Sequence, residues 1–283
     1  HEVTEIAADK KVVIARDLIS GSESEISFDK LILSPGASPI VPPIPGIERA
    51  LTLRTVEDVL RIYDAVEVKP KNAVVIGGGF IGIEMAENLV HRGIKTALIE
   101  ALPQVLAPLD PEMAELVHME LRKNGIDLHL ANSVKEITES EVILADGTKV
   151  SAELVIASIG VKPDTTLAKA AGLEIGTRGG VAVNKFNQTS NPDIYAIGDA
   201  AEKSDELTGE STLIPLANIA NRHGRITADH IVGKPVREVS SIGTAIVKVF
   251  DLAVATTGWN AKRLTAASKP FKEIHTHPNS HEI

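Results

Sequence analysis

The residues best suited to bind a charged ligand form a glycine-rich turn between an apolar run and a helical pattern. The turn consists of Gly77, Gly78, Gly79, Phe80, Ile81 and Gly82. In such a G-x-G-x-x-G turn, Gly77 permits the tight bend, Gly79 lets the backbone approach a pyrophosphate, and Gly82 lets the helix pack on the strand. Because free N–H groups at a helix start attract anions, the turn predicts a dinucleotide phosphate site.

An acid follows the glycine turn at the position that selects the nucleotide. Glu100 ends the next apolar run, 23 residues after Gly77. A carboxylate there accepts hydrogen bonds from the adenosine ribose hydroxyls and repels a 2′-phosphate. The following residues, 101–103, include no Lys or Arg to receive a phosphate. We therefore expect NADH to be preferred over NADPH. The alternative is a glycine turn that serves packing alone, and the presence of the strand, the helix and the acid together disfavours it.

Two shorter motifs are compatible with a second nucleotide. Gly198 and Asp199 follow a buried apolar run, where the Asp199 carboxylate can bind a ribityl hydroxyl of a flavin; helix capping is the alternative. Ser34, Pro35 and Gly36 follow another apolar run, and a simple turn is the alternative there. Neither motif is specific by itself.

Hydrophobic periodicity places these motifs on alternating strands and helices. Strands are predicted over 73–76, 96–99, 154–159 and 194–197, and helices over 55–66, 80–91, 111–125, 165–171 and 216–232. Thr55 and Asp58 predict a capping box, Asp110 before Pro111 predicts a helix N-cap, and Asp146-Gly147 predicts a hairpin turn. Residues 1–33 and those after 240 read as strands, with a polar turn at 20–25. Five prolines between residues 35 and 45 indicate an extended crossover. The alternation predicts a doubly wound, parallel α/β sheet.

The composition excludes several classes of protein. The 283 residues carry a net charge of −9, contain no cysteine and are 43% apolar. A disulfide framework and a thiolate metal site within the chain are excluded, and a general nucleic-acid binder is disfavoured because such proteins are basic. The sequence has no apolar run of about 18 residues, so no membrane span is predicted. We expect a cytoplasmic protein with no membrane partner.

Taken in order, these motifs resemble the FAD-dependent pyridine nucleotide-disulfide oxidoreductases over essentially the whole chain. The matching segments are 31–39, 77–82, 160–163 and 191–201. The family's first motif reads Ala-Thr-Gly, and here only Gly36 matches it strictly. The resemblance implies an α/β fold with two Rossmann-like regions, the FAD one incomplete, and the start of an α+β dimerisation domain.

The resemblance also implies domain boundaries and site residues. Residues 1–68 and 188–238 would form the partial FAD-binding domain, 69–187 the NAD-binding domain, and 239–283 a truncated dimerisation domain. Asp199 would bind the flavin side of FAD, and Glu84 would lie near flavin and nicotinamide, with a solvated helix charge as the alternative. The remaining cofactor-binding residues implied in this way are Arg54, Gly160, Gly198, Pro215, Leu216 and Ala217.

The segment after Ser240 resembles the coenzyme A disulfide reductase and NADH oxidase branch, which uses a single redox cysteine. Residues 277–281 resemble the segment that precedes a Tyr-Tyr pair in coenzyme A disulfide reductases. His275, His277 and His281 suggest a metal site as an alternative, but without a firm carboxylate or thiolate partner we expect no metal.

The resemblance implies a hydride transfer from NADH to FAD and on to a small-molecule disulfide, possibly coenzyme A disulfide, in a homodimer. The family's first FAD glycine loop and redox cysteine are not in this sequence. It therefore implies a fragment without catalytic residues of its own, which binds NADH weakly and FAD poorly. The alternatives are an NADH oxidase that reduces dioxygen and a non-catalytic nucleotide-binding module.

Overall fold

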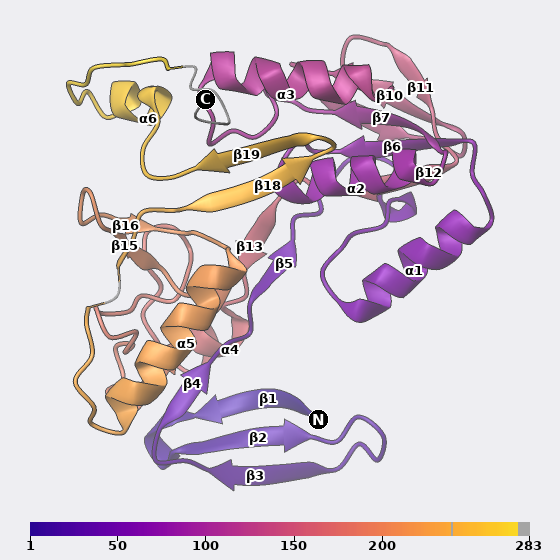
Figure 1. Ribbon diagram of the computed structural model, residues 1–283. Coiled ribbons are helices and arrows are strands. Elements are labelled where there is room, and N and C mark those ends of the chain that lie inside the picture. The colour runs from indigo at the N-terminus through magenta and orange to yellow at the C-terminus, as the bar shows by residue number, and fades with distance from the viewer. Residues whose placement is uncertain (239, 277–283) are drawn as a thin grey trace.

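The computed structural model describes residues 1–238 and 240–276 and is built around a parallel four-stranded sheet (Figure 1). The strands, in spatial order, are β12 (Leu154–Ala157), β6 (Asn72–Ile76), β7 (Lys95–Ile99) and β8 (Asp127–His129). Helix α2 (Phe80–His91) joins β6 to β7, and helix α3 (Pro111–Lys123) joins β7 to β8. The prediction of a parallel α/β sheet is confirmed.

Strand β6 is buried on both faces because its side chains alternate between two apolar cores. Ala73 and Val75 pack into the core that includes α2 and α3. Val74 and Ile76 pack into the core beneath a second, antiparallel sheet. That sheet consists of β9 (Val134–Ile137), β10 (Glu141–Leu144) and β11 (Lys149–Ser151). Double burial explains why the strand reads as an unbroken apolar run.

Helix α1 (Val56–Glu67) begins with the predicted capping box. Thr55 Oγ1 accepts a hydrogen bond from the Asp58 N–H at 3.3 Å, and Asp58 Oδ2 accepts from the Thr55 N–H at 2.9 Å. The hydrogen bond from the Thr55 N–H and a second one from the Arg54 backbone N–H lower the pKa of the Asp58 carboxyl. At α3 the structure differs, because the Asp110 side chain does not cap the helix and instead accepts hydrogen bonds from the Ala261 and Lys262 N–H groups.

A second region contains the N-terminal strands. β4 (Leu31–Leu33) pairs in parallel with β14 (Ile194–Ala196), and β1 (Glu2–Ala7), β2 (Val12–Arg16) and β3 (Glu23–Ser27) form an antiparallel meander. The predicted polar turn at 20–25 was therefore wrong in its second half, which belongs to β3. All residues of β3 are exposed, so it lacks the alternation that reveals a half-buried strand, and pairing with β2 decides its conformation.

The proline-rich crossover is extended, as predicted, and contributes a short strand. β5 (Ala37–Pro39) pairs antiparallel with β13 (Val161–Pro163), which links the two regions. A two-stranded ladder has only edges, so prolines fit there.

Beyond residue 240 a hairpin of β18 (Ala245–Val249) and β19 (Leu252–Thr256) inserts Val247, Val249 and Phe250 into the core of α2 and α3. A short helix, α6 (Ala261–Ala266), follows where only strands were expected. Asn260 caps it by accepting from the Arg263 N–H at 2.9 Å, a local signal that the strand reading overlooked.

The other elements are α4 (Thr166–Ala170), α5 (Ala217–Ile231), β15 (Lys203–Asp205), β16 (Ser211–Thr212), β17 (Ser240–Ser241) and the 3₁₀ turns η1 (Ala8–Lys10), η2 (Ile47–Arg49) and η3 (Gly198–Ala200). Among the described residues, no helix has the length and apolar character to cross a bilayer.

Candidate functional site

A cavity of about 370 Å³ opens at the carboxyl ends of β6, β7 and β12. Ligands of open parallel sheets bind at this edge. Five of the residues expected to bind nucleotide line it, namely Gly77, Gly78, Gly79, Glu100 and Gly160. The structure thus brings the glycine turn and its acid into one cavity of a size that suits part of a dinucleotide.

The three glycines of the motif serve different purposes. Gly77 has a φ of +106°, and a Cβ there would lie 2.5 Å from the Ser158 carbonyl oxygen. A Cβ on Gly82 would lie 1.9 Å from the Gly77 carbonyl oxygen, so both positions serve the bend and the packing of α2. A Cβ on Gly79 would meet no atom of the described residues within 4 Å. The open space at Gly79 faces the start of α2, where an anion can approach the backbone.

Four other expected residues lie on α2 outside the cavity lining. Phe80 packs against the apolar core, Gly82 is buried, and Ile81 and Glu84 are exposed. They lie on the helix whose start borders the cavity, and a role of these four residues in cofactor binding, including a contact of Glu84 with flavin, stays a prediction.

Glu100 is fixed by two backbone hydrogen bonds. Its Oε2 accepts from the Gly78 N–H at 2.6 Å, and its Oε1 accepts from the Leu102 N–H at 2.8 Å. A carboxylate offers about four acceptor positions, so about two remain for ribose hydroxyls. The same bonds tie the acid to the glycine turn, which holds both parts of the fingerprint in a fixed relation.

One wall of the cavity is a loop that no sequence motif indicated. Residues 101–109 connect β7 to α3, and Gln104 and Ala107 line the cavity. Leu106 donates its N–H to the Gly78 carbonyl at 2.8 Å with a left-handed φ of +48°. Such a conformation is unfavourable for leucine and persists where the surroundings impose it. Only tertiary contacts reveal this wall, since the loop has no compositional signature.

The motifs expected to bind FAD meet at the carboxyl ends of β4 and β14. A Cβ on Gly198 would lie 3.8 Å from Ser34 Oγ, which places the turn of Ser34, Pro35 and Gly36 beside η3 and its Asp199. Gly36 and Gly198 have φ of +75° and +69°, so both turns use glycine's backbone freedom.

Arg54 joins this second site by holding its turn. Its Nη2 donates to the Pro35 carbonyl at 2.6 Å, and its Nη1 donates to Ser38 Oγ at 2.7 Å. The structure therefore places the Arg54 guanidinium against the turn of residues 34–38, and its proximity to FAD stays a prediction.

The start of α5 completes the same region. α5 lies against η3, where a Cβ on Gly198 would be 3.6 Å from Ala220 Cβ. Pro215 and Ala217 are exposed and Leu216 is half-buried. Among the described residues no side chain at the cap position Leu216 bonds the helix start, although Asn218 Oδ1 accepts from the Ile219 N–H at 2.8 Å. Uncapped N–H groups at a helix start can bind polar ligand atoms.

Behind η3 the structure buries two basic side chains that the sequence interpretation did not single out. Lys203 Nζ donates to the Ala201 carbonyl at 2.8 Å and to the Gly198 carbonyl at 2.5 Å. Burial lowers the pKa of Lys203 to about 8. Burial and the charge of Lys203 lower the pKa of His223 to about 4, and its Nδ1 has no hydrogen-bond partner among the described residues. Burial of a Lys or His has no local sequence signal.

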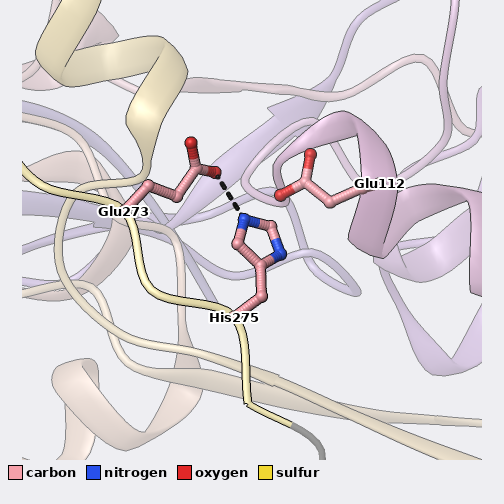
Figure 2. Close-up of side chains that lie close together, drawn as sticks. All are labelled: Glu112, Glu273 and His275. Carbon is pink, nitrogen blue, oxygen red and sulfur yellow. Dashed lines mark ion pairs between the residues drawn. The ribbon is translucent and has the colours of Figure 1, made fainter.

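The histidine-rich end of the chain falls only partly within the described residues. His275 is described, whereas His277, His281 and the segment 277–281 lie outside them. His275 Nε2 lies 3.2 Å from Glu273 Oε1, with Glu112 of α3 close by (Figure 2). All three side chains are exposed, and this surface ion pair with a neighbouring carboxylate gives no ground to assign a metal.

The sequence matches the profile of the family described as pyridine nucleotide-disulphide oxidoreductase over residues 1–224. An NADH oxidase of Methanocaldococcus jannaschii is 38% identical over 90% of this chain and 57% of its own length. A CoA-dependent NAD(P)H sulfur oxidoreductase of Pyrococcus furiosus is 34% identical over 93% of this chain and 63% of its own length. The chain thus spans about 60% of the length of these relatives.

Solved structures give the same result. The reduced CoADR-RHD of Bacillus anthracis superposes with a TM-score of 0.92 at 45% identity, covering 95% of this chain and 50% of that one. A FAD-dependent pyridine nucleotide-disulphide oxidoreductase from Desulfovibrio vulgaris has a TM-score of 0.87 at 28% identity, and the match covers 94% of this chain and 69% of that one. The water-forming NADH oxidase of Lactobacillus brevis, bound to NADH, has a TM-score of 0.87 at 28% identity, covering 95% and 60%.

These matches confirm the expected fold and, at the level of the family, the expected cofactor classes FAD and NADH. The profile covers most of the chain, and its matched span includes the glycine turn, Glu100 and Asp199. The chain belongs to the pyridine nucleotide-disulphide oxidoreductase family.

Proposed function

We propose that this protein is a flavoprotein oxidoreductase that uses NADH to reduce a small-molecule disulfide, with coenzyme A disulfide as the preferred substrate class. The observation that carries the nucleotide part is the cavity in which Gly79 leaves open space beside the fixed carboxylate of Glu100. When bound, NADH and FAD supply the hydride-transfer chemistry.

In this proposal the chain's own residues bind and orient the two cofactors. The start of α2 holds the pyrophosphate, and Glu100 accepts from the ribose hydroxyls and disfavours NADPH. Asp199 accepts from the flavin side of FAD, beside the turn that Arg54 holds. The N–H groups at the start of α5 face negative charge on the flavin.

The choice of a disulfide acceptor rests on the relatives. The P. furiosus relative is named as CoA-dependent, and the B. anthracis structure is named CoADR-RHD. The 283 residues contain no cysteine, so the proposal assigns them the binding of both nucleotides and leaves thiol chemistry to the additional length that relatives have. We also propose the domain boundaries given above, a homodimer and a cytoplasmic location.

A second candidate is an NADH oxidase that reduces dioxygen, because the M. jannaschii and L. brevis proteins carry that name. The two functions share the nucleotide sites and differ in the acceptor.

Because the 283 residues contain no cysteine, the acceptor is tested with the protein expressed from its complete reading frame and loaded with FAD. NADH consumption is measured with coenzyme A disulfide under argon and, separately, with air alone. Turnover under argon with release of free thiol supports the disulfide reductase. Turnover that requires air refutes it in favour of the oxidase, and NADH binding without turnover under either condition favours the nucleotide-binding module.

The coenzyme role is tested with Glu100→Ala. Loss of the proposed bonds to the ribose should raise the NADH dissociation constant about 10-fold or more. The NADH and NADPH dissociation constants should then differ by a smaller factor than in the unaltered protein. Fluorescence titration measures both constants, and Glu136→Ala, on the exposed side of β9, is the control. Unchanged NADH affinity in Glu100→Ala would contradict the assigned role.

A further inference from the structure

The loop of residues 101–109, which forms one wall of the cavity, is bonded by the segment that contains α6. Helix α6 lies beside the start of α3 (Figure 1), more than 150 residues along the chain from this loop. Its capping residue, Asn260, donates Nδ2–H to the Pro108 carbonyl at 2.9 Å.

Lys262 of α6 makes the central contact. Its Nζ donates to Gln104 Oε1 at 2.8 Å and to the Ala107 carbonyl at 3.0 Å. Gln104 and Ala107 both line the cavity, whereas Lys262 is not one of its lining residues. Gln104 is 7% exposed and also donates Nε2–H to the Leu109 carbonyl at 3.0 Å. Lys262 is therefore bonded to a buried side chain that itself holds the backbone of the loop.

The beginning of α6 is fixed to the end of the same loop. Asp110 accepts from the Ala261 N–H at 3.0 Å and from the Lys262 N–H at 3.2 Å. The carboxylate thus satisfies the first N–H groups of α6 and fixes the position from which the Lys262 side chain extends. The three residues Asn260, Lys262 and Asp110 form what we call the α6 clamp.

The loop needs such support because its conformation is unfavourable. Leu106 is buried in a left-handed conformation, with its N–H directed to the Gly78 carbonyl at 2.8 Å. Val105 is buried against Gly78, where an added Cβ would come within 2.7 Å of Val105 Cγ1. A shift of the loop therefore moves the backbone that also binds Glu100.

We propose that Lys262 is a positioning residue for the adenosine half of NADH, acting through Gln104 and the loop of residues 101–109. This inference rests on the proposed function, since it takes the cavity to be the NADH site. It assigns the C-terminal segment a part in coenzyme binding that the glycine fingerprint does not contain.

The test compares Lys262→Met with the unaltered chain in titrations with NADH, 5′-AMP and reduced nicotinamide mononucleotide. A residue acting without ligand contact changes affinity by about 2- to 30-fold. We expect a rise of that size in the dissociation constants of NADH and AMP and no change for the mononucleotide, which lacks the adenosine half. A loss of general structure would weaken all three ligands equally.

Further variants separate the clamp from other effects. Lys269→Met changes an exposed lysine of the same segment and should leave all constants unaltered. Asn260→Ala removes a different contact to the same loop and should act in the same direction as Lys262→Met. In the double variant Lys262→Met/Gln104→Leu, the NADH dissociation constant should rise by less than the product of the two single effects, because either substitution alone already removes the bond between these two residues.

The outcomes of the proposed function and of this inference are distinguishable. If the unaltered chain does not bind NADH, the proposed function fails. If it binds NADH and Lys262→Met leaves the NADH and AMP constants unchanged, the proposed function stands and the clamp is refuted. Faster amide hydrogen exchange at Leu106 in Lys262→Met, measured without nucleotide, would support the clamp independently.

Discussion

Replacement of Gly79 by alanine separates the binding role of the glycine turn from its structural role. Gly79 is the N-terminal cap residue of α2, with φ of −78° and ψ of −174°, a conformation that alanine adopts. Within the part of the chain that the structure describes, an added Cβ meets no atom within 4 Å. Alanine is a poorer cap than glycine by about 0.5 kcal/mol, and the less flexible unfolded chain offsets this by about 0.4–1 kcal/mol. The free energy of unfolding should therefore change by less than about 0.5 kcal/mol.

The nucleotide, by contrast, loses the close approach that Gly79 permits. The new methyl group occupies the space in front of the α2 N–H groups and displaces the pyrophosphate from at least one charge-assisted hydrogen bond of about 1.5–3 kcal/mol. This corresponds to a rise of about 10- to 150-fold in the NADH dissociation constant. Fluorescence titration with NADH and urea unfolding of the same preparation give the two quantities.

Gly77→Ala is the contrasting variant. At a φ of +106°, with the Ser158 carbonyl oxygen 2.5 Å from the added Cβ, it should lower the free energy of unfolding by at least about 1–3 kcal/mol. Unchanged NADH affinity in a folded Gly79→Ala protein would refute the assignment of the phosphate site. Marked destabilisation by Gly79→Ala would refute the claim that its space is open.

Two further predictions concern the buried bases behind η3. The pKa of His223 is about 4 in the folded chain against 6.5 ordinarily, so the unfolded state binds the proton first and stability falls as the pH drops from 6.5 to 4. With screening taken into account, the loss is about 2 kcal/mol, and it should be absent from His223→Gln in urea unfolding across this range. The pKa of Lys203 is about 8 against 10.5, so stability rises between pH 8 and 10.5 as the ammonium deprotonates first in the folded chain. The free energy of unfolding should rise by about 3 kcal/mol over this range, and this rise should be missing from Lys203→Met. A variant whose free energy of unfolding depends on pH as that of the unaltered protein does would contradict the burial argument.

The sequence by itself determined the parts of this protein that depend on neighbouring residues. The glycine turn, the strand before it, the helix after it and Glu100 were all identified, because a bend, a periodicity and a fixed spacing are local properties. The capping box at Thr55 and the hairpin turn at Gly147 were found for the same reason. The exposed strand β3 and the short helix α6 were missed, since neither has a buried face that repeats along the sequence.

Only the tertiary structure decided which distant residues meet. Arg54 was expected near FAD, yet its bond to the Pro35 carbonyl depends on how the crossover folds back. Lys262 reaches Gln104 over a separation of 158 residues, and Lys203 is buried behind η3 although nothing around it in the sequence is unusual. The physical reason is that burial and long-range hydrogen bonds depend on the packing of whole elements, which local sequence patterns do not contain.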